Sequence, residues 1–450
     1  MSVDNSYVIE ETQTKEELDK IINDLTEEVD RLYIFRDHYF ENYPLEKAVD
    51  KDSEVQEKLD ITIGSFTKCE ETTISDLIRA KFLYLKGKAL NVLPKFDQRA
   101  EQALSKAVKL DPDLVEAWNE LGECYWKDSN LPEAKNCFSG ALPHKRNKIS
   151  LRSLSIVLRQ EVSLTPQERQ KNIEKSVELA KEALQLDPKD GVSWCILGNA
   201  YLSSFFVVAQ DPAILKLCMS SYKQALNDPV ARGQSDLHYN RAVALMYEEE
   251  FSAALESFTK AIALDPTWED PTTEKQKLVT YLDDLTDLIR TKGKIKGKKL
   301  QQMMQQLLWS KHLGPYADGH YTSGVHSIKL QLTPLSQLKA EMNPEIVVLG
   351  KVVCSIRNER TVPFTFCIMD AEGTCIGVTV YNLADGKGVI IGDHIAIPEP
   401  FVTHHSFTHN KEYKFSSIRV DNPMVMVVNG KKVGKDQMAG TKLTSYYRVS

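Results

Sequence analysis

Residues 115–146 of this 450-residue chain read VEAWNELGECYWKDSNLPEAKNCFSGALPHKR. Large and small residues recur there three and four positions apart, which is the spacing of one face of an α-helix. The pattern occupies two segments: Trp118, Leu121, Gly122 and Tyr125 in the first, and Ala134, Phe138 and Ala141 in the second. Because Gly122 has no side chain, the second helix can lie close to the first, with Phe138 filling the gap. Such a helical pair cannot bury its face alone, so the chain should contain further copies.

The spacing is that of the tetratricopeptide repeat, and about six copies can be counted. The first, within residues 1–70, is atypical and is interrupted at Tyr43-Pro44, as suits a terminal repeat with a single neighbour. Repeats two to six occupy residues 74–270, with insertions in the fourth and fifth. Residues 271–310 are interpreted as a capping helix, which seals the last core, followed by a basic arm.

The hydrophobic period changes near residue 320. Runs rich in β-branched and aromatic residues, separated by Gly, Asn and Asp, lie at 345–356, 362–370, 375–381, 394–397, 414–420 and 424–428. Gly350 inside the first run indicates a bulge or bend. Residues 320–430 are therefore predicted to form an OB-fold domain, and residues 431–450 a polar tail. The predicted fold class is an α-solenoid of about six tetratricopeptide repeats followed by an all-β OB-fold barrel.

Composition limits the classes of function. The net charge of −7 disfavours general nucleic-acid binding, so any such contact must be local. None of the eight cysteines forms a Cys-x-x-Cys pair, which indicates reduced thiols and a location in the cytoplasm or nucleus. No apolar run of membrane-spanning length and no secretory leader are evident, so no membrane partner is expected.

Signatures of enzymes are missing. The sequence contains no phosphate-binding loop, no Gly-x-Ser-x-Gly elbow and no His-Glu-x-x-His motif, so we expect neither an enzyme nor a cofactor. His404, His405 and His409 could in principle bind a metal ion, but an exposed polar loop is the favoured interpretation. No metal site is predicted.

The concave surface of the solenoid is the candidate binding site. Positions 2, 5, 9 and 12 of each first helix point away from the core and should line this groove with apolar side chains and single charges. Such a lining suits a short peptide held by charge-assisted hydrogen bonds. Arg159 would receive a carboxylate, and Asp236, helped by Glu269 or Asp270, would receive a basic side chain. The alternative for each residue is a solvated groove charge.

One known kind of groove can be tested from the sequence. Repeats that clamp a C-terminal carboxylate place Lys and Asn in one repeat and Asn in the next. Asn199 and Asn240 occupy the two Asn positions, but Cys195 replaces the Lys. A clamp for chaperone tails is therefore disfavoured.

Five lysines occur in eight residues of the arm: Lys292, Lys294, Lys296, Lys298 and Lys299. Contact with nucleic-acid phosphates is the favoured function, and a nuclear-import signal or a solvated linker are the alternatives. The barrel itself could stack bases on aromatic side chains. Phe364 and Phe366, however, share a face with Ile368, so barrel core is the favoured interpretation of that stripe.

Several local sequences, together with the order of the domains, carry a family resemblance: Trp118-Asn-Glu-Leu-Gly-Glu, Phe138-Ser-Gly-Ala-Leu, Asp236-Leu-His-Tyr-Asn-Arg-Ala, Lys292-Gly-Lys-Ile-Lys and Ile397-Pro-Glu-Pro. The chain closely resembles the tetratricopeptide repeat protein five family over nearly its whole length. The resemblance implies two roles. One is a tubulin autoregulation adaptor that binds the N-terminal peptide of nascent tubulins at the ribosome and promotes decay of their messages. The other is a nuclear, stress-responsive co-activator that scaffolds a histone acetyltransferase complex on chromatin.

The resemblance also implies roles for particular residues. Arg159 is the implied partner of a peptide carboxylate, and Asp236 an acidic partner. The acidic residue after the tryptophan corresponds to Asp270, although Glu269 stands beside it and the choice stays open. Lys296 and Lys298 are the implied contacts to ribosomal RNA. We therefore expect a non-enzymatic adaptor whose partners are a nascent tubulin peptide, the ribosome and an mRNA-decay adaptor, with a co-activator that binds DNA through its OB domain as the alternative.

Overall fold

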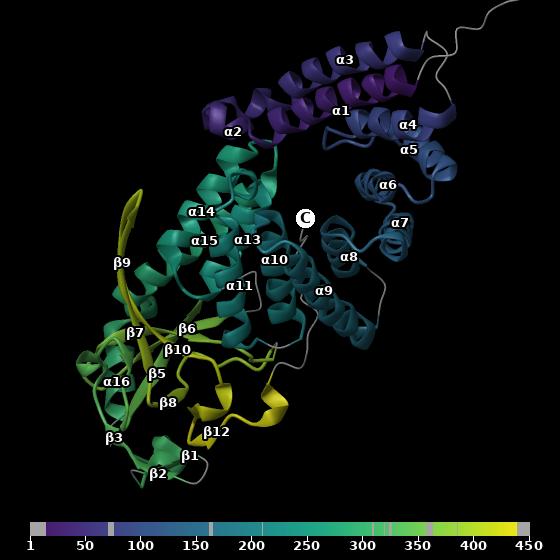
Figure 1. The fold of residues 1–450 in the computed structure, drawn as a ribbon. Coiled ribbons are helices and arrows are strands. Elements are labelled where there is room, and N and C mark those ends of the chain that lie inside the picture. Colours follow the sequence, from purple (N-terminus) through teal and green to yellow (C-terminus); the bar gives the residue numbers. More distant parts are fainter. Residues whose placement is uncertain are drawn as a thin grey trace, which may run out of the picture.

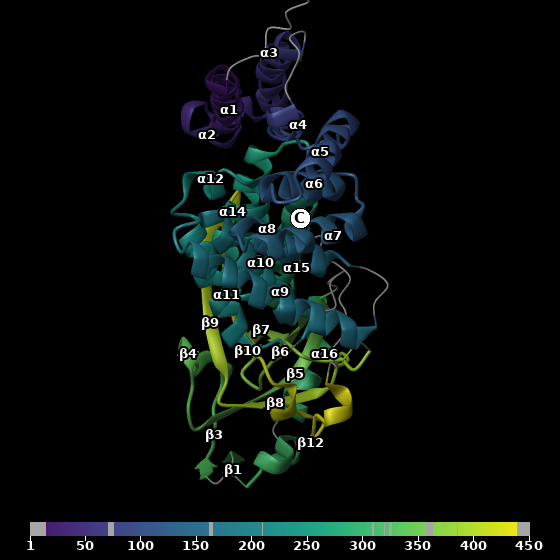
Figure 2. The ribbon, with the colours of Figure 1, turned by 45° about the vertical axis from the view of Figure 1, so that its right-hand side comes forward.

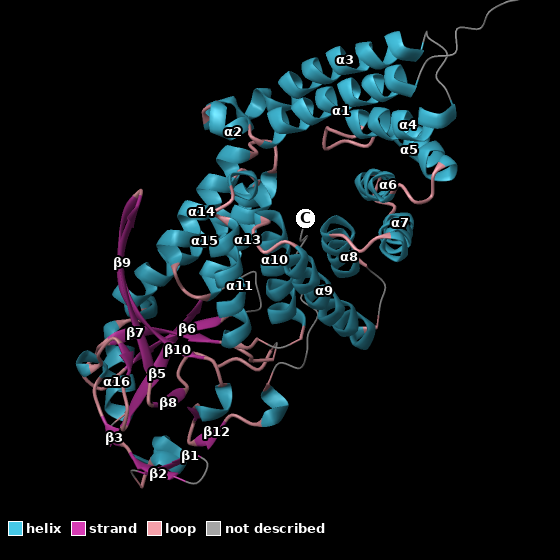
Figure 3. Ribbon diagram, viewed as in Figure 1, coloured by secondary structure: helices cyan, strands magenta, loops and turns pink. Residues whose placement is uncertain are grey.

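The computed structural model describes residues 15–70, 76–161, 165–208, 210–307, 310–318, 320–323, 326–356, 363–384 and 386–438. Helices form the N-terminal part of the chain and strands the C-terminal part, and the two occupy separate halves of the molecule (Figure 3). The predicted order of a helical solenoid followed by a β domain is confirmed.

The solenoid begins with an irregular unit and continues with regular helical pairs. The first unit contains α1 (Lys15–Asp37), α2 (Tyr39–Asn42), η1 (Leu45–Asp50) and α3 (Lys51–Glu70). The pairs are α4 (Asp76–Leu90) with α5 (Gln98–Leu110), α6 (Val115–Lys127) with α7 (Leu131–His144), α8 (Lys148–Gln160) with α9 (Pro166–Leu186), α10 (Gly191–Val207) with α11 (Pro212–Ala225), and α13 (Ser235–Tyr247) with α14 (Phe251–Leu264). A short helix, α12 (Pro229–Arg232), precedes the last pair. The expected interruption at Tyr43-Pro44 lies between α2 and η1.

Glycine sets the distance between the two helices of a repeat. A Cβ atom at Gly122 would lie 2.6 Å from the ring of Phe138, and one at Gly198 would lie 2.5 Å from the ring of Tyr222. Because neither distance leaves room for a side chain, the repeats pack as closely as the sequence predicts. Successive pairs then share continuous apolar cores.

The solenoid curves back on itself. It runs from α1 and α3 through α6 and α8 to α13 and α14, so that the first unit meets the last pair (Figures 1 and 2). Segment η1 contacts α14, and the ring of Phe40 lies 3.8 Å from where a Cβ at Gly233 would be. The first helices of the repeats therefore face one another across the inside of a tight arc.

The β domain is one twisted sheet wrapped around an apolar interior. Its strands are β3 (Gln331–Leu332), β4 (Glu341–Met342), β5 (Ile346–Ile356), β6 (Phe364–Met369), β7 (Cys375–Val380), β8 (His394–Pro398), β9 (Phe401–His409), β10 (Lys411–Val420), β11 (Val427–Val428) and β12 (Lys431–Lys432). Strand order is β12-β11-β8-β5-β6-β7-β10-β9-β4, with β7 and β10 parallel. Only Glu399 and Pro400 separate β8, which pairs with β5, from β9, which pairs with β10. The path of strands thus returns on itself, as in an OB fold. A separate hairpin, β1 (His320–Ser323) and β2 (His326–Lys329), precedes it.

The interior of the barrel contains the aromatic stripe that the sequence assigned to it. Phe366 and Ile368 are fully buried in the interior cluster, and Phe364 packs against its edge. The prediction of barrel core for this stripe is confirmed. These rings are therefore not a platform on which bases could stack.

Three expectations for the β domain are wrong. His404, His405 and His409 do not form a polar loop but lie on β9, and His405 is buried between the rings of Phe251 and Phe415. The bulge in β5 lies between Val352 and Cys354, whereas at Gly350 the backbone approaches Ile368 closely.

The third concerns the tail, because ordered structure continues past residue 430. Strand β12 and segment η6 (Lys435–Gln437) follow, and Met438 bridges to Leu383. Residues 439–450 of the predicted tail lie outside the described residues.

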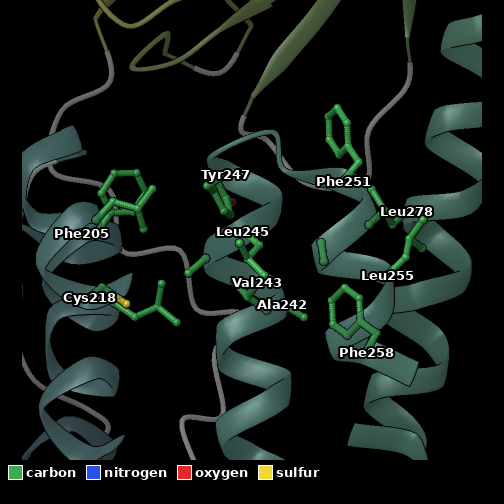
Figure 4. Close-up of a cluster of buried hydrophobic side chains, with 14 of the residues drawn as sticks. Phe205, Cys218, Ala242, Val243, Leu245, Tyr247, Phe251, Leu255, Phe258 and Leu278 are labelled. Carbon is green, nitrogen blue, oxygen red and sulfur yellow. The ribbon is translucent and has the colours of Figure 1, made fainter. Parts of the chain in front are cut away.

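A long helix, α15 (Glu269–Arg290), joins the two halves. One continuous apolar cluster runs from α10, α11, α13 and α14 into α15, and Figure 4 shows its central side chains, including Phe205, Tyr247, Phe251, Phe258 and Leu278. The same cluster includes the outward-facing side chains of the barrel. The arm follows as η2 (Lys292–Lys294), α16 (Gly297–Gln306) and η3 (Ser310–Tyr316). Within the described residues, no helix has the length and apolar character needed to span a membrane.

Candidate peptide groove and basic arm

Arg159 lies near the end of α8 and is only 8% exposed. Its Nη1 donates to the carbonyl oxygen and the hydroxyl of Ser155, at 3.0 and 2.7 Å. Its Nε and Nη2 are buried and have no hydrogen-bond partner among the described residues. Burial lowers the pKa of Arg159 to about 10. A guanidinium held in this way retains two unused donors, the fork that a carboxylate accepts.

Asp236 lies in the first turn of α13 and makes no ion pair within the described part of the chain. Burial raises the pKa of Asp236 to about 6, although backbone N–H groups at the start of the helix act in the opposite direction. The carboxylate is therefore a partly buried anion without a cation. Binding a cationic side chain would supply the missing charge.

Cys195 on α10 lies near both charged groups. The pKa of the Cys195 thiol is raised mainly by burial and also by Asp236, and is lowered by Arg159. Both charges are thus close enough to act on one buried sulfur. Because α10 contacts both α8 and α13, these helices bring a carboxylate receptor and a cation receptor into one neighbourhood.

Two asparagine side chains accompany this pair of charges. The amide oxygen of Asn199 accepts a hydrogen bond from the hydroxyl of Tyr222 at 2.8 Å. Asn240 is fully buried, and neither its amide oxygen nor its amide nitrogen has a partner among the described residues. Because unsatisfied buried amides are costly, Asn240 is a second sign that a polar ligand belongs here. The sequence analysis named Asn240 only as one position of a disfavoured carboxylate clamp and did not indicate that its amide would be unsatisfied.

The floor of the groove differs from the expectation. Cys195, Leu202 and Val243 occupy positions 5, 12 and 9 of their helices, which were expected to line the groove, but they are completely buried in the apolar cluster. The reason is the tight curvature of the solenoid, which packs α10 against both α8 and α13. The exposed lining is therefore narrower than a helical wheel predicts.

The two candidate acids after the tryptophan begin α15. Asp270 accepts a hydrogen bond from the indole nitrogen of Trp268 at 3.2 Å, and Trp268 packs on Tyr239 with ring centroids 4.7 Å apart. Tyr239 lies one helical turn after Asp236. Through Trp268 and Tyr239, Asp270 is thus connected to α13, the helix that carries Asp236. Glu269 is exposed in the same turn of α15.

A second group of charges in the solenoid was missed. Glu120 on α6 accepts hydrogen bonds from Asn91 at 3.1 Å and from Tyr33 at 3.4 Å. Burial and the neighbouring Glu123 raise the pKa of Glu120 to about 7. In the sequence, this group is indicated by two carboxylates three residues apart, Glu120 and Glu123. The surrounding hydrogen bonds make this group part of the packing of the first repeats.

The basic arm divides into anchored and free lysines. Lys294 pairs with Asp287 at 3.0 Å, and Gly293, with φ +70°, lies directly against the carbonyl of Val353 on β5. Lys296 and Lys298 are exposed and form no ion pair with any described residue. The arm therefore presents Lys296, Lys298 and the equally exposed Lys299 as cations that have no ion pair among the described residues.

The outward face of strands β6 and β7 is covered. OB folds use the face of their second and third strands to bind oligonucleotides, and these strands are β6 and β7 here. Thr365, Cys367 and Thr379 point outward from them and are buried at 0–2% exposure. Tyr281 of α15 lies 3.2 Å from the hydroxyl of Thr365, and Leu285 packs over Gly377.

A buried glutamate completes this contact. Glu249, in the turn between α13 and α14, accepts hydrogen bonds from Thr379 at 2.6 Å, Tyr381 at 3.1 Å and Ser417 at 3.3 Å. Arg419 lies 4.0 Å from the same carboxylate. The face that binds oligonucleotides in other OB folds is here the docking surface for the solenoid.

Comparison with known proteins agrees with this architecture. Residues 329–442 match the family described as tetratricopeptide repeat protein 5 OB fold domain, and residues 98–135 and 235–267 match tetratricopeptide repeat families. Tetratricopeptide repeat protein 5 of Homo sapiens is 48% identical over 434 residues, which cover 96% of this chain and 98% of that protein. The Mus musculus protein of the same name is 47% identical over the same shares. Among solved structures, YrrB, described as a TPR protein with an unusual peptide-binding site, matches 47% of this chain and 97% of its own at 22% identity and a TM-score of 0.31.

Proposed function

Since this chain belongs to the tetratricopeptide repeat protein 5 family, we propose that it acts as an adaptor that binds the N-terminal peptide of nascent tubulins in its solenoid groove. In this proposal the arm docks on ribosomal RNA, and the bound adaptor promotes decay of the tubulin message through a decay adaptor. The action takes place in the cytoplasm, where translating ribosomes are found.

One observation carries the proposal. Near Cys195, Arg159 has two buried donors and Asp236 is an anion, and neither is satisfied by a partner among the described residues. A tubulin N-terminus that begins Met-Arg-Glu-Ile carries a cation and a carboxylate side by side. The peptide's arginine would pair with Asp236 and its glutamate with Arg159, and Asn240 can then hydrogen-bond the peptide backbone.

The arm supports simultaneous binding at a second site. Lys296 and Lys298 are exposed on a turn that packs on the barrel, and the barrel packs on α13 through Glu249. Groove and arm are thus held in a fixed relation. Two linked sites on one ribosome complex bind together more tightly than either alone.

The test uses ribosome–nascent-chain complexes that display either a tubulin N-terminus or a control N-terminus. Wild type, Arg159→Glu and Lys296→Glu/Lys298→Glu are compared, with Lys106→Glu/Lys109→Glu, two exposed lysines of α5, as the matched charge control. We expect both test variants to lose at least about tenfold in affinity for tubulin complexes, while the control variant binds as wild type does. Equal binding by all four proteins would overturn the proposal.

The alternative is a nuclear co-activator that scaffolds a histone acetyltransferase complex and binds DNA through its OB domain. Helix α15 covers β6 and β7. The surface through which OB folds usually bind oligonucleotides is therefore not available for this alternative. Titration of the full chain with single-stranded DNA at low salt separates the two. Binding that survives Lys296→Glu/Lys298→Glu would favour the co-activator.

A further inference from the structure

Three thiols lie together on the outer face of the barrel. Cys354 on β5 and Cys367 on β6 are directly opposite each other in the antiparallel register, and Cys375 on β7 is a diagonal neighbour of Cys367, two residues before Gly377, which lies opposite Cys367. Cys354 and Cys367 are 5% and 0% exposed, and Cys375 is partly exposed. The group lies under α15 and the arm, within the cluster that joins the two domains.

The thiols contact one another. The Cys367 side chain interacts with both Cys354 and Cys375. The interaction with Cys367 lowers the pKa of Cys354, and the same interactions raise the pKa of Cys367 strongly. With its lowered pKa, Cys354 is the member of the pair that reacts more readily with oxidants as the thiolate.

The backbone geometry suits one pair in particular. Directly opposite residues of an antiparallel pair have Cα atoms about 4.5–5.5 Å apart, within the range of about 4.4–6.8 Å seen for disulfides. Diagonal neighbours are about 7–8 Å apart, beyond that range. Cys354 can therefore bond to Cys367 with little movement of the backbone, whereas Cys375 cannot.

The arm is seated on the same spot. The nearest atoms to a Cβ placed on Gly293 would be the carbonyl of Val353 at 2.3 Å and the Cβ of Cys354 at 3.2 Å. The side chain of Met304 and the Nζ of Lys292 lie close to Gly373, in the turn that leads to Cys375. A shift of β5 at its bulge is thus transmitted to the turn that carries Lys296 and Lys298.

We propose that Cys354 and Cys367 form a redox modification site, at which a peroxide-class oxidant makes a disulfide that weakens the seating of the basic arm. The Cys354 thiolate attacks one peroxide oxygen and breaks the O–O bond, which yields a sulfenic acid and hydroxide. The Cys367 sulfur then attacks the sulfenic sulfur and displaces its hydroxyl. Each hydroxide takes up a proton, so two thiols and one hydrogen peroxide become one disulfide and two waters.

The first experiment maps disulfides in the full chain. Protein treated with hydrogen peroxide and then with an alkylating agent is digested without reduction and analysed by mass spectrometry. We expect a peptide pair that links Cys354 to Cys367, absent from Cys354→Ser and from Cys367→Ser and retained in Cys375→Ser. Cys124 and Cys137, whose pKa values burial raises to about 12, serve as internal controls and should stay alkylated. Absence of the linked pair, or linkage of Cys367 to Cys375, would overturn the site.

The second experiment measures binding of a ribosomal RNA fragment before and after oxidation. This part rests on the proposed function of the arm. We expect oxidised wild type to bind about threefold or more weakly than reduced protein, and Cys354→Ser/Cys367→Ser to be insensitive to peroxide. A mapped disulfide with unchanged affinity would refute the coupling to the arm. Lack of RNA binding by the reduced protein would instead refute the arm's proposed function and leave the mapped disulfide standing.

Discussion

Two buried polar regions of this molecule, the groove around Cys195 and the outer face of the barrel, differ in one respect. At the barrel face, Glu249 receives hydrogen bonds from Thr379, Tyr381 and Ser417. In the groove, Arg159 and Asn240 have buried polar atoms without partners in the described part of the chain, and there Asp236 has no cation. The first region is complete in the protein alone, and the second is not.

The unsatisfied polar groups of the groove indicate a ligand-binding site more clearly than the fold does. An OB fold suggests nucleic-acid binding, yet here its binding face is satisfied by the solenoid. Unsatisfied buried polar groups raise the free energy of the unbound protein, so they persist where function requires them. Removing a polar group should therefore lower the free energy of unfolding at the barrel face and raise it in the groove.

The largest effect is expected at the barrel face. Glu249→Ala leaves three hydroxyl groups and Arg419 without their shared acceptor, so the free energy of unfolding should fall by about 2–4 kcal/mol. Urea unfolding followed by circular dichroism measures this change. Glu250→Ala, the exposed neighbouring carboxylate, should change stability by less than about 0.5 kcal/mol. A small loss for Glu249→Ala would show that the face is not a matched docking surface.

The groove should respond in the opposite direction. The pKa of Asp236 is about 6 in the folded protein and 3.8 as its ordinary value, so the folded state binds more protons and loses stability as pH rises from about 4 to 6. Asp236→Asn should therefore raise the unfolding free energy at pH 7 by about 1–2 kcal/mol, allowing for partial exposure. At pH 4 the gain should vanish. A loss of stability at pH 7 would show that Asp236 already has a partner.

Peptide binding should depend on the same carboxyl group. A cationic peptide side chain binds the ionised form, so affinity for a Met-Arg-Glu-Ile peptide should rise about tenfold from pH 5 to pH 7. Fluorescence anisotropy with a labelled peptide measures this directly. Asp236→Asn should bind weakly and show a flat profile. An unchanged slope in that variant would place the titrating group elsewhere.

The smallest effect concerns the arm. Lys296→Gln/Lys298→Gln should reduce the slope of log affinity against log salt for ribosome binding by about 1.4–1.8, because two phosphate contacts are removed. Peptide affinity in the groove should not change. The control pair Lys106→Gln/Lys109→Gln should leave the slope as it is in wild type. An unaltered slope in the arm variant would argue against RNA contact by these two lysines.

Much of the fold was predictable because periodicity records which side chains are buried. Gly122 with Phe138 predicted a close helical pair, and Phe366 with Ile368 predicted the barrel interior. Strand β9 was missed because its histidines and threonines lack a clear apolar alternation. His405 is nevertheless buried, by packing against Phe251 of the other domain.

The candidate site was only partly predictable. A helical wheel placed Arg159 and Asp236 on the same side of their helices, but it contains no information on how sharply successive repeats turn. That curvature buries Cys195, and Ser155 is the partner that the described residues provide for Arg159. The cover over β6 and β7 was also unpredictable, because it depends on contacts between α15 and strands about a hundred residues later in the chain.

Arg159→Met keeps the length of the side chain and removes its unpaired charge, so its stability shows directly whether the groove is incomplete without a ligand. We expect the unfolding free energy to rise by about 1–2 kcal/mol while binding of the Met-Arg-Glu-Ile peptide is lost. A fall in stability of the size expected for Glu249→Ala, with peptide affinity unchanged, would contradict this expectation.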